Sequence, residues 1–169
     1  LQLADPAAAR AQMERVADGL KDSVSQVRRI ARGLAPVDLD DASLGDALKR
    51  LAAEIYEMRG IPCAVDAEPD LRLVDPARAM HVYQIAQEAV NNAARHAGAE
   101  GITITLKRKA SGIHLSVEDD GRGLGGSASS EAGMGLRLMQ HRASLLGASL
   151  KIGPRGGKGG TSVELTVPR

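Results

Sequence analysis

The stretch Gln87-Glu88-Ala89-Val90-Asn91-Asn92-Ala93-Ala94-Arg95-His96 decides how the rest of the chain is interpreted. Two glycine-rich stretches follow it, Asp119-Asp120-Gly121-Arg122-Gly123 and Gly133-Met134-Gly135-Leu136. Glu88 and Asn92 are four residues apart, so a helix would place both on one face, about one turn from each other. A polar helix face, an acidic turn after a strand and a helix that opens with glycine could together hold a nucleotide and its metal ion.

The pair Glu88 and Asn92 has the chemistry of a magnesium site beside phosphates. Mg²⁺ prefers hard oxygen ligands and usually takes only one or two of them from the protein. Asn92 supplies such an oxygen without adding charge beside a triphosphate. Glu88 is a second candidate ligand, or it orients or deprotonates a nucleophile. A lone Glu-x-x-x-Asn pair is more common on a solvated helix face, so this prediction depends on the other two stretches.

Asp119 is expected to end a strand, before a turn in which Gly121 and Gly123 let the backbone approach a ligand closely. A carboxylate there accepts a hydrogen bond from the exocyclic amine of adenine. Guanine presents a carbonyl at that position, and an unpaired buried carboxylate facing it is penalised by about 1 to 3 kcal/mol. The turn therefore predicts adenine, although an isolated run of this kind is more typical of a surface turn or a loose calcium loop.

Gly133-Met134-Gly135 at the start of a helix exposes unpaired backbone N–H groups and the positive end of the helix dipole, which suits a phosphate. On its own this motif is weak, because many helices begin with glycine. Phe and Trp are absent and the only aromatic residues are Tyr56 and Tyr83. We therefore expect any base-binding pocket to be aliphatic.

The bulk composition restricts the class of protein. A length of 169 residues allows one core-bearing domain with an extension. The chain has 22 basic and 21 acidic side chains, which gives no reason to expect nucleic acid or an anionic membrane as a partner. The single Cys63 excludes a disulfide framework and favours the cytoplasm. Because the sequence begins at Leu1 and shows neither a signal peptide nor a membrane span, we expect a soluble piece of a longer protein.

The chain is expected to begin with a long helix that starts at Asp5-Pro6 and stops before Pro36. Its apolar residues form a heptad seam, which indicates packing against other helices or, alternatively, against the core of its own domain. The seam consists of Met13, Ala17, Leu20, Val24, Val27, Ala31 and Leu34. Further helices are predicted at 43–60, 75–98 and 136–146, strands at 63–66, 102–109, 113–117, 149–152 and 162–167, and a mobile loop at 124–132.

Taken in order, these motifs and the late Gly159-Gly160-Thr161 resemble the ATP-binding fold shared by gyrase, heat-shock chaperone, histidine kinase and mismatch-repair ATPases. The resemblance covers roughly residues 44 to 169. Within that superfamily, Gln-Glu-Ala-Val-x-Asn-Ala-x-Arg-His, a short lid and Gly-Leu-Arg-x-Met-x-x-Arg-Ala-x-x-Leu-Gly resemble sensor histidine kinases of the nitrate-sensor type. Arg32-Gly33-Leu34-Ala35-Pro36-Val37-Asp38-Leu39 is similar to the end of that family's second dimerisation helix.

This resemblance implies an α/β fold, a two-layer sandwich of a mixed sheet of about five strands with helices on one face, preceded by a long N-terminal helix. It assigns residues 1–40 to the second helix of a dimerisation and phosphotransfer hairpin, and 41–169 to an ATP-binding catalytic domain. The implied activity is transfer of the ATP γ-phosphate to a histidine on an upstream helix that this chain lacks. The implied partners are a second copy in the full-length bacterial kinase and a response regulator with a helix-turn-helix output domain.

Carried over by position, the resemblance implies ATP and Mg²⁺ as cofactors, with Asn92 on the metal and Glu88 assisting transfer. Arg95 and His96 would lie near the phosphates, and Asp119 would hold adenine. The remaining residues implied to shape the pocket and its lid are Gly121, Gly123, Gly133, Gly135, Leu136 and Thr161.

Some positions depart from the family pattern. Asp120 stands where the family often has Asn, which adds negative charge near the metal region. Met134 replaces a frequent His, and His141 a common Glu. The family phosphorylates a His followed by Asp, and no histidine of this chain has that setting. The histidines are His81, His96, His114 and His141.

Three alternatives share the predicted pocket. An anti-sigma-factor type of serine/threonine kinase is disfavoured by the heptad helix and by the junction at residues 35–39. A catalytically silent ATP-sensing dimerisation module would bind the nucleotide without transferring phosphate. A gyrase-like hydrolase is disfavoured by the short lid and the lack of a following transducer domain.

Overall fold

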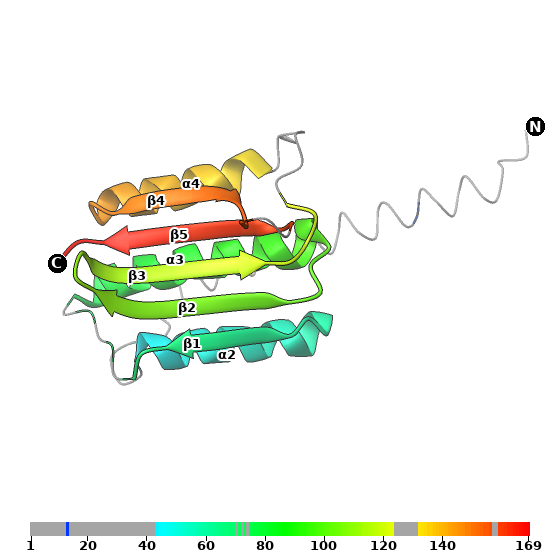
Figure 1. Ribbon diagram of the computed structural model, residues 1–169, viewed down its shortest axis with the longest axis horizontal. Helices are drawn as coiled ribbons and strands as arrows, with labels where there is room; N and C mark the ends of the chain where they lie inside the picture. The colour runs from blue at the N-terminus through cyan, green and yellow to red at the C-terminus, as the bar shows by residue number, and fades with distance from the viewer. Residues whose placement is uncertain are drawn as a thin grey trace, which may run out of the picture. The chain divides into compact units, whose positions relative to one another are not determined.

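The computed structural model describes residues 13, 43–69, 71, 73, 75–123, 132–156 and 159–169 (Figure 1). Apart from Met13, the predicted N-terminal helix lies outside these residues, as does the loop predicted from residue 124 up to residue 131. The described elements are α2 (Leu44–Arg59), β1 (Cys63–Ala67), α3 (Pro76–Asn92), the π-helical turn η1 (Ala93–Ala97), β2 (Ile102–Lys109), β3 (Gly112–Asp119), α4 (Ala132–Leu145), β4 (Ser149–Pro154) and β5 (Thr161–Val167).

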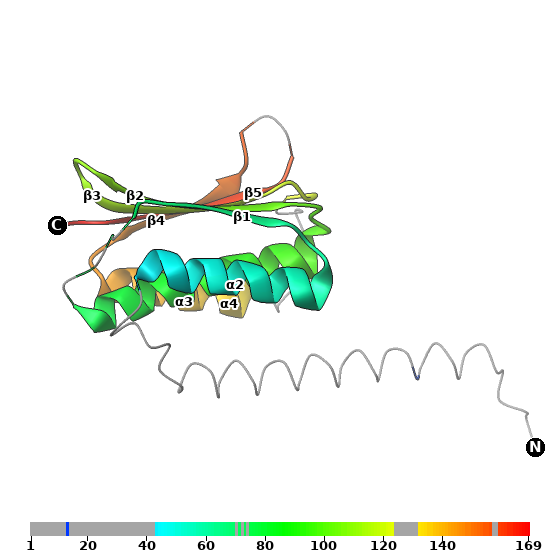
Figure 2. The same cartoon turned by 90° about the horizontal axis from the view of Figure 1, so that it is seen from below.

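The five strands form one mixed sheet in the order β1-β2-β3-β5-β4. β1 pairs with β2 in parallel, and every other neighbouring pair is antiparallel. Helices α2, α3 and α4 lie side by side against one face of the sheet (Figure 2). The predicted two-layer α/β sandwich is therefore confirmed. In the described part of the chain, no helix combines the length and apolar character that crossing a membrane requires.

Period-two alternation in the strands sends apolar side chains to the helix-covered face. Ile104 of β2 stands opposite Val117 of β3, and Leu106 stands opposite Leu115. All four side chains are buried, and they pack over the helices. The core therefore lies between the sheet and the helix layer.

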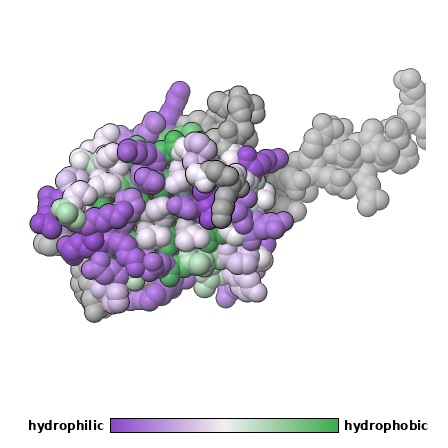
Figure 3. Space-filling view, in the orientation of Figure 1, coloured by the Kyte–Doolittle hydropathy of each residue, from purple (hydrophilic) through white to green (hydrophobic). Residues whose placement is uncertain are grey.

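The outer face of the sheet is polar, and Figure 3 shows it as largely purple and white. Ion pairs join separate elements there: Lys107 of β2 contacts Asp66 of β1, and Arg155 Nε, just after β4, lies 3.2 Å from Glu118 Oε2 of β3. This face has the alternating pattern of a solvated sheet surface.

The residues predicted to cap the helices form the expected hydrogen bonds or end the helices as expected. The Ser43 hydroxyl accepts from the backbone N–H of Asp46 at 3.2 Å, and the Asp75 carboxylate accepts from the N–H of Ala77 at 2.8 Å. Both interactions satisfy N–H groups that the first turn leaves unpaired. Gly60 and Gly98 end their helices in the left-handed region, with φ of 68° and 60°.

Two predicted boundaries differ from the structure. The third predicted helix reaches Gly98, but its last turn, η1, is π-helical rather than α-helical. The helix predicted from Leu136 begins at Ala132, so Gly133 and Gly135 lie inside the first turn of α4 rather than before it. Their N–H groups belong to the first turn, whose N–H groups have no partner within the helix.

Candidate nucleotide-binding site

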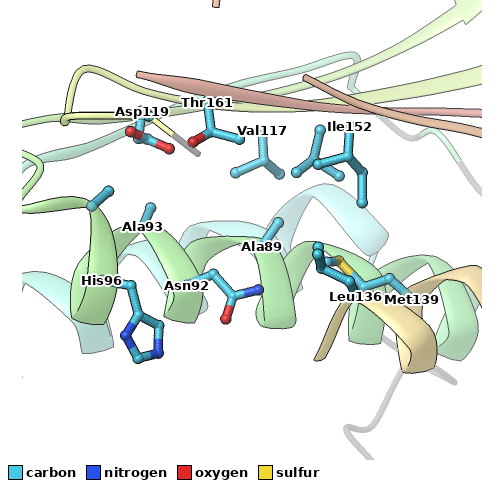
Figure 4. Close-up of a pocket in the computed structure, with 13 residues that line it drawn as sticks. Ala89, Asn92, Ala93, His96, Val117, Asp119, Leu136, Met139, Ile152 and Thr161 are labelled. Carbon is cyan, nitrogen blue, oxygen red and sulfur yellow. The ribbon is translucent and has the colours of Figure 1, made fainter. Parts of the chain in front are cut away.

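A pocket opens between the sheet and the helix layer, bounded by α3, η1 and α4 (Figure 4). Asp119 and Thr161 project from the sheet at one end, and Leu136 and Met139 of α4 lie at the other end. Most of the lining is aliphatic, as the composition predicts. The lining residues are Ala89, Asn92, Ala93, His96, Ala97, Val117, Asp119, Gly123, Leu136, Met139, Ile152, Thr161 and Val163.

Asp119 is the last residue of β3 and is 4% exposed. Its Oδ1 atom accepts a hydrogen bond from the backbone N–H of Gly121 at 2.9 Å. This bond fixes the carboxylate at the start of the turn that follows β3 and orients it toward the pocket (Figure 4). A buried carboxylate in a mostly aliphatic pocket selects ligands that offer it a hydrogen-bond donor.

Asp120, the next residue, points elsewhere. Its Oδ1 atom accepts from the backbone N–H groups of Glu100 and Gly101, at 2.8 and 2.9 Å. The hydrogen bond from Gly101 is the main cause that lowers the pKa of the Asp120 carboxyl below its usual value. The Asp120 side chain therefore ties the end of β3 to the segment that precedes β2.

Three close backbone approaches shape the base of the pocket. A Cβ at Gly121 would collide with the carbonyl oxygen of Ala97, and a Cβ at Gly160 with that of Asp119. A Cβ at Gly123 would lie 3.1 Å from the carbonyl oxygen of Gly160. The turn after β3 is thus pressed against η1 on one side and against the β4–β5 turn on the other. This is the physical reason for glycine in the motifs Asp-x-Gly-x-Gly and Gly-Gly-Thr.

The polar residues of α3 and η1 form a second part of the site. In Figure 4 the Asn92 amide and the His96 imidazole point away from the sheet, while Ala89 and Ala93 face it. The pocket thus has an apolar floor toward the sheet and a polar border along the helix. This arrangement suits a ligand with a flat apolar ring and a charged tail.

Glu88 lies outside the pocket lining and faces the first turn of α4. A Cβ at Gly135 would collide with Glu88 Oε1 and would lie 3.5 Å from Asn92 Nδ2. Gly135 therefore allows the start of α4 to approach the predicted catalytic pair Glu88 and Asn92 closely.

The structure brings together most of the predicted site residues. Those that line the pocket are Asn92, His96, Asp119, Gly123, Leu136 and Thr161. Gly121 adjoins the pocket through its hydrogen bond to Asp119, and Gly135 and Glu88 adjoin it at α4. Arg95 lies in η1 without lining the pocket, and Gly133 is in the first turn of α4.

Sequence reasoning predicted an aliphatic pocket but did not identify the apolar residues that line it. A signal was available on α3 and η1, where alanines recur every fourth residue, each directly after one of the polar positions Glu88, Asn92 and His96. The strand and α4 contributions had no such local signal. The missed residues are Ala89, Ala93, Ala97, Val117, Met139, Ile152 and Val163.

The side chains of the site suit a cation that is coordinated mainly by the bound nucleotide rather than by the protein. Among the residues that the structure describes, no group of three His, Cys, Asp or Glu side chains converges on a metal position. The Asn92 amide oxygen is a hard, neutral donor of the type that Mg²⁺ accepts beside phosphate oxygens and water. The residues present therefore fit Mg²⁺ bound together with a nucleotide, and they do not form an all-protein cage.

Comparison with known families agrees with this geometry. Residues 77–169 match the family model described as "Histidine kinase-, DNA gyrase B-, and HSP90-like ATPase". Because the match covers more than half of the sequence, the chain belongs to this ATPase family. The family consists of ATPases, and this confirms the prediction that the chain binds ATP.

Named relatives are sensor kinases. The sensor histidine kinase MctS of Rhizobium johnstonii is 31% identical over 160 residues, which are 93% of this chain and 34% of the relative. The signal transduction histidine-protein kinase/phosphatase UhpB of Salmonella typhimurium is 32% identical over 158 residues, 93% of this chain and 30% of the relative. The chain thus spans about a third of the length of these curated relatives.

Solved structures show the same architecture. The histidine kinase domain of the blue-light activated histidine kinase EL346 from Erythrobacter litoralis has a TM-score of 0.61 and 28% identity. That match covers 74% of this chain and 60% of the other. The ATP-binding domain of PrrB from Mycobacterium tuberculosis has a TM-score of 0.61 and 21% identity, covering 75% of this chain and 94% of the other, and supports the fold alone.

Proposed function

We propose that this chain is the ATP-binding catalytic part of a two-component sensor histidine kinase. The observation that carries the proposal is one pocket in which a buried carboxylate, Asp119, stands at one end and Asn92 and the start of α4 border the other (Figure 4). Family membership and the sensor-kinase relatives support the same activity. No relative named above is an anti-sigma kinase, so the main alternative has no comparable support.

Asp119 would recognise adenine. Gly121 already occupies one carboxylate oxygen, and the other would accept from the exocyclic amine of the base. Ala93, Val117 and Ile152 would enclose the ring between helix and sheet. Guanine would set its carbonyl oxygen against the carboxylate, and this mismatch disfavours GTP.

The polar border of α3 would receive the phosphates. Asn92 would hold Mg²⁺ through its amide oxygen, and the ion would neutralise charge on the triphosphate. The N–H groups in the first turn of α4 would bind phosphate oxygens, with Arg95 and His96 nearby. Glu88 would orient the acceptor or receive its proton.

The remaining parts of the proposal concern the longer protein. The γ-phosphate would pass to a histidine on an upstream helix and then to an aspartate of a response regulator with a helix-turn-helix output domain. Residues 1–40 would belong to the dimerisation hairpin and residues 41–169 to the catalytic domain. The longer protein would be a homodimer whose catalytic part lies in the cytoplasm. The nearly balanced charge of this chain supports a catalytic part that contacts neither nucleic acid nor a membrane.

Calorimetric titration with Mg-ATP and Mg-GTP tests the pocket assignment. The unaltered chain should prefer ATP, and Asp119→Asn should abolish the preference because an amide presents a donor as well as an acceptor. Asn92→Ala should weaken the dependence of ATP affinity on magnesium while leaving the preference for adenine. Equal affinity of the unaltered chain for both nucleotides would contradict the assignment of Asp119.

A further inference from the structure

A polar link joins α3 to α4 away from the pocket lining. The Nε atom of Arg142 in α4 donates to the Oε1 atom of Gln84 in α3 at 2.9 Å. The two residues are 58 positions apart in sequence, and the bond is partly buried. The amide of Gln84 is neutral, so it satisfies a hydrogen bond of the guanidinium without balancing its charge.

Glu88 carries a negative charge that acts on Arg142. It lies four residues after Gln84 and therefore on the same face of α3, one turn closer to Asn92. Burial lowers the pKa of Arg142, and the charge of Glu88 raises it in opposition. Because Arg142 is hydrogen-bonded to Gln84, one turn before Glu88 on the same helix face, its guanidinium lies on the side of α3 that carries Glu88.

The face of α4 that carries Arg142 also approaches Glu88 at Gly135. Gly135 lies seven residues before Arg142, which is two turns along α4, and the missing side chain of Gly135 makes room for Glu88 Oε1. Gln84 thus meets α4 at Arg142, and Glu88 meets it at Gly135. The carboxylate of Glu88 thus lies beside the helix start that is proposed to bind phosphate, one turn along α3 from the residue that binds Arg142.

We propose that Arg142 is a positioning residue that anchors α4 on Gln84 and supplies the counter-charge of Glu88 at the phosphate end of the site. The inference rests on the proposed function, because it requires a triphosphate near the start of α4. Without Arg142, the Glu88 carboxylate repels the triphosphate and α4 loses its polar anchor on α3. Adenosine, which lacks phosphates, does not experience this repulsion.

The test compares Mg-ATP and adenosine binding in the chain and in Arg142→Gln, by calorimetry and by NMR titration. Removal of the Arg142 charge should weaken the binding of Mg-ATP about tenfold and that of adenosine less than about twofold. Arg142→Lys, which keeps the charge, should restore most of the affinity. Arg50→Gln, an exposed arginine on α2, is the matched control and should bind as the unaltered chain does.

The double variant Glu88→Gln with Arg142→Gln separates charge compensation from general damage. Once Glu88 is neutral, removal of Arg142 should weaken Mg-ATP less than about threefold, because there is no carboxylate left to compensate. Equal loss of ATP and adenosine affinity, or a full loss that persists beside Glu88→Gln, would overturn the inference. If Arg142→Gln does not fold in thermal unfolding, the same comparison is made with Arg142→Lys and Arg142→Met. Failure of the unaltered chain to bind ATP would instead reject the proposed function.

Discussion

Arg122 donates two hydrogen bonds from its guanidinium to the backbone carbonyl oxygen of His96, from Nε at 3.1 Å and from Nη2 at 2.9 Å. The backbone N–H of Arg122 also donates to the carbonyl oxygen of Ala97 at 2.9 Å. These bonds satisfy carbonyl groups that the end of a helix leaves unpaired. The turn that follows Asp119 and the helical turn η1 that follows Asn92 are therefore joined by one arginine.

Arg122→Ala should loosen this junction. We expect the free energy of unfolding to fall by about 1 kcal/mol, since charge-assisted hydrogen bonds at an exposed site contribute about that much. Urea unfolding measures the change, and ATP affinity should fall with it because Asp119 loses its fixed distance from α3. Arg108→Ala, at an exposed position of β2, is the control. Equal stability of the two variants would show that the hydrogen bonds to His96 contribute nothing.

Local chemistry made much of the fold predictable. Ser43 and Asp75 are side-chain caps, and Gly60 and Gly98 end helices, so these four residues predict helix boundaries without knowledge of any partner. Strand alternation likewise predicts the buried face of β2 and β3. Such signals act over a few residues, which is why they can be read from the sequence alone.

Other features depend on contacts between distant segments. Nothing near Arg142 in sequence indicates Gln84, and nothing near Asp120 indicates the N–H groups of Glu100 and Gly101. Met139 became a pocket residue only when α4 packed against α3. The motif glycines could be predicted to lie near a ligand, but their collisions with particular carbonyl groups required the tertiary structure.

Gly160 and Gly156 allow a matched test of the pocket base. Gly160 has φ of +91°, and a Cβ there would collide with the carbonyl oxygen of Asp119, whereas Gly156 has open space around it. Gly160→Ala should lower the free energy of unfolding by at least about 2 kcal/mol, because it adds backbone strain to a steric clash. Gly156→Ala should change it by less than about 0.5 kcal/mol. Thermal unfolding distinguishes them, and similar losses in both would mean that the turn adapts freely.

Cys63 provides a test of burial at the other end of the sheet. Burial raises the pKa of its thiol to about 11. At pH 8 the folded chain should hold only about one thiolate per thousand molecules, compared with at least a tenth when unfolded. Alkylation by iodoacetamide, followed by mass spectrometry, should therefore be about a hundredfold slower without urea than in urea. A similar rate in both conditions would show that the Cys63 thiol is accessible and readily ionised.

The hydrogen bonds to Asp120 predict how low pH affects the stability of the fold. The backbone N–H groups of Gly101 and Glu100 favour its ionised form, so the folded-state pKa lies below the ordinary value of 3.8 for this carboxyl group. A depressed carboxyl pKa stabilises the fold at every pH above the unfolded-state value, and this stabilisation is lost as pH falls from about 3.8 through the folded-state pKa. The contribution should not exceed about 1 kcal/mol, because the side chain is exposed and solvent screens it. Urea unfolding of the unaltered chain and Asp120→Ala at pH 7 and near pH 3 should show a difference that shrinks in acid. An equal difference at both values would mean that the ionised carboxylate is not what links the end of β3 to Gly101.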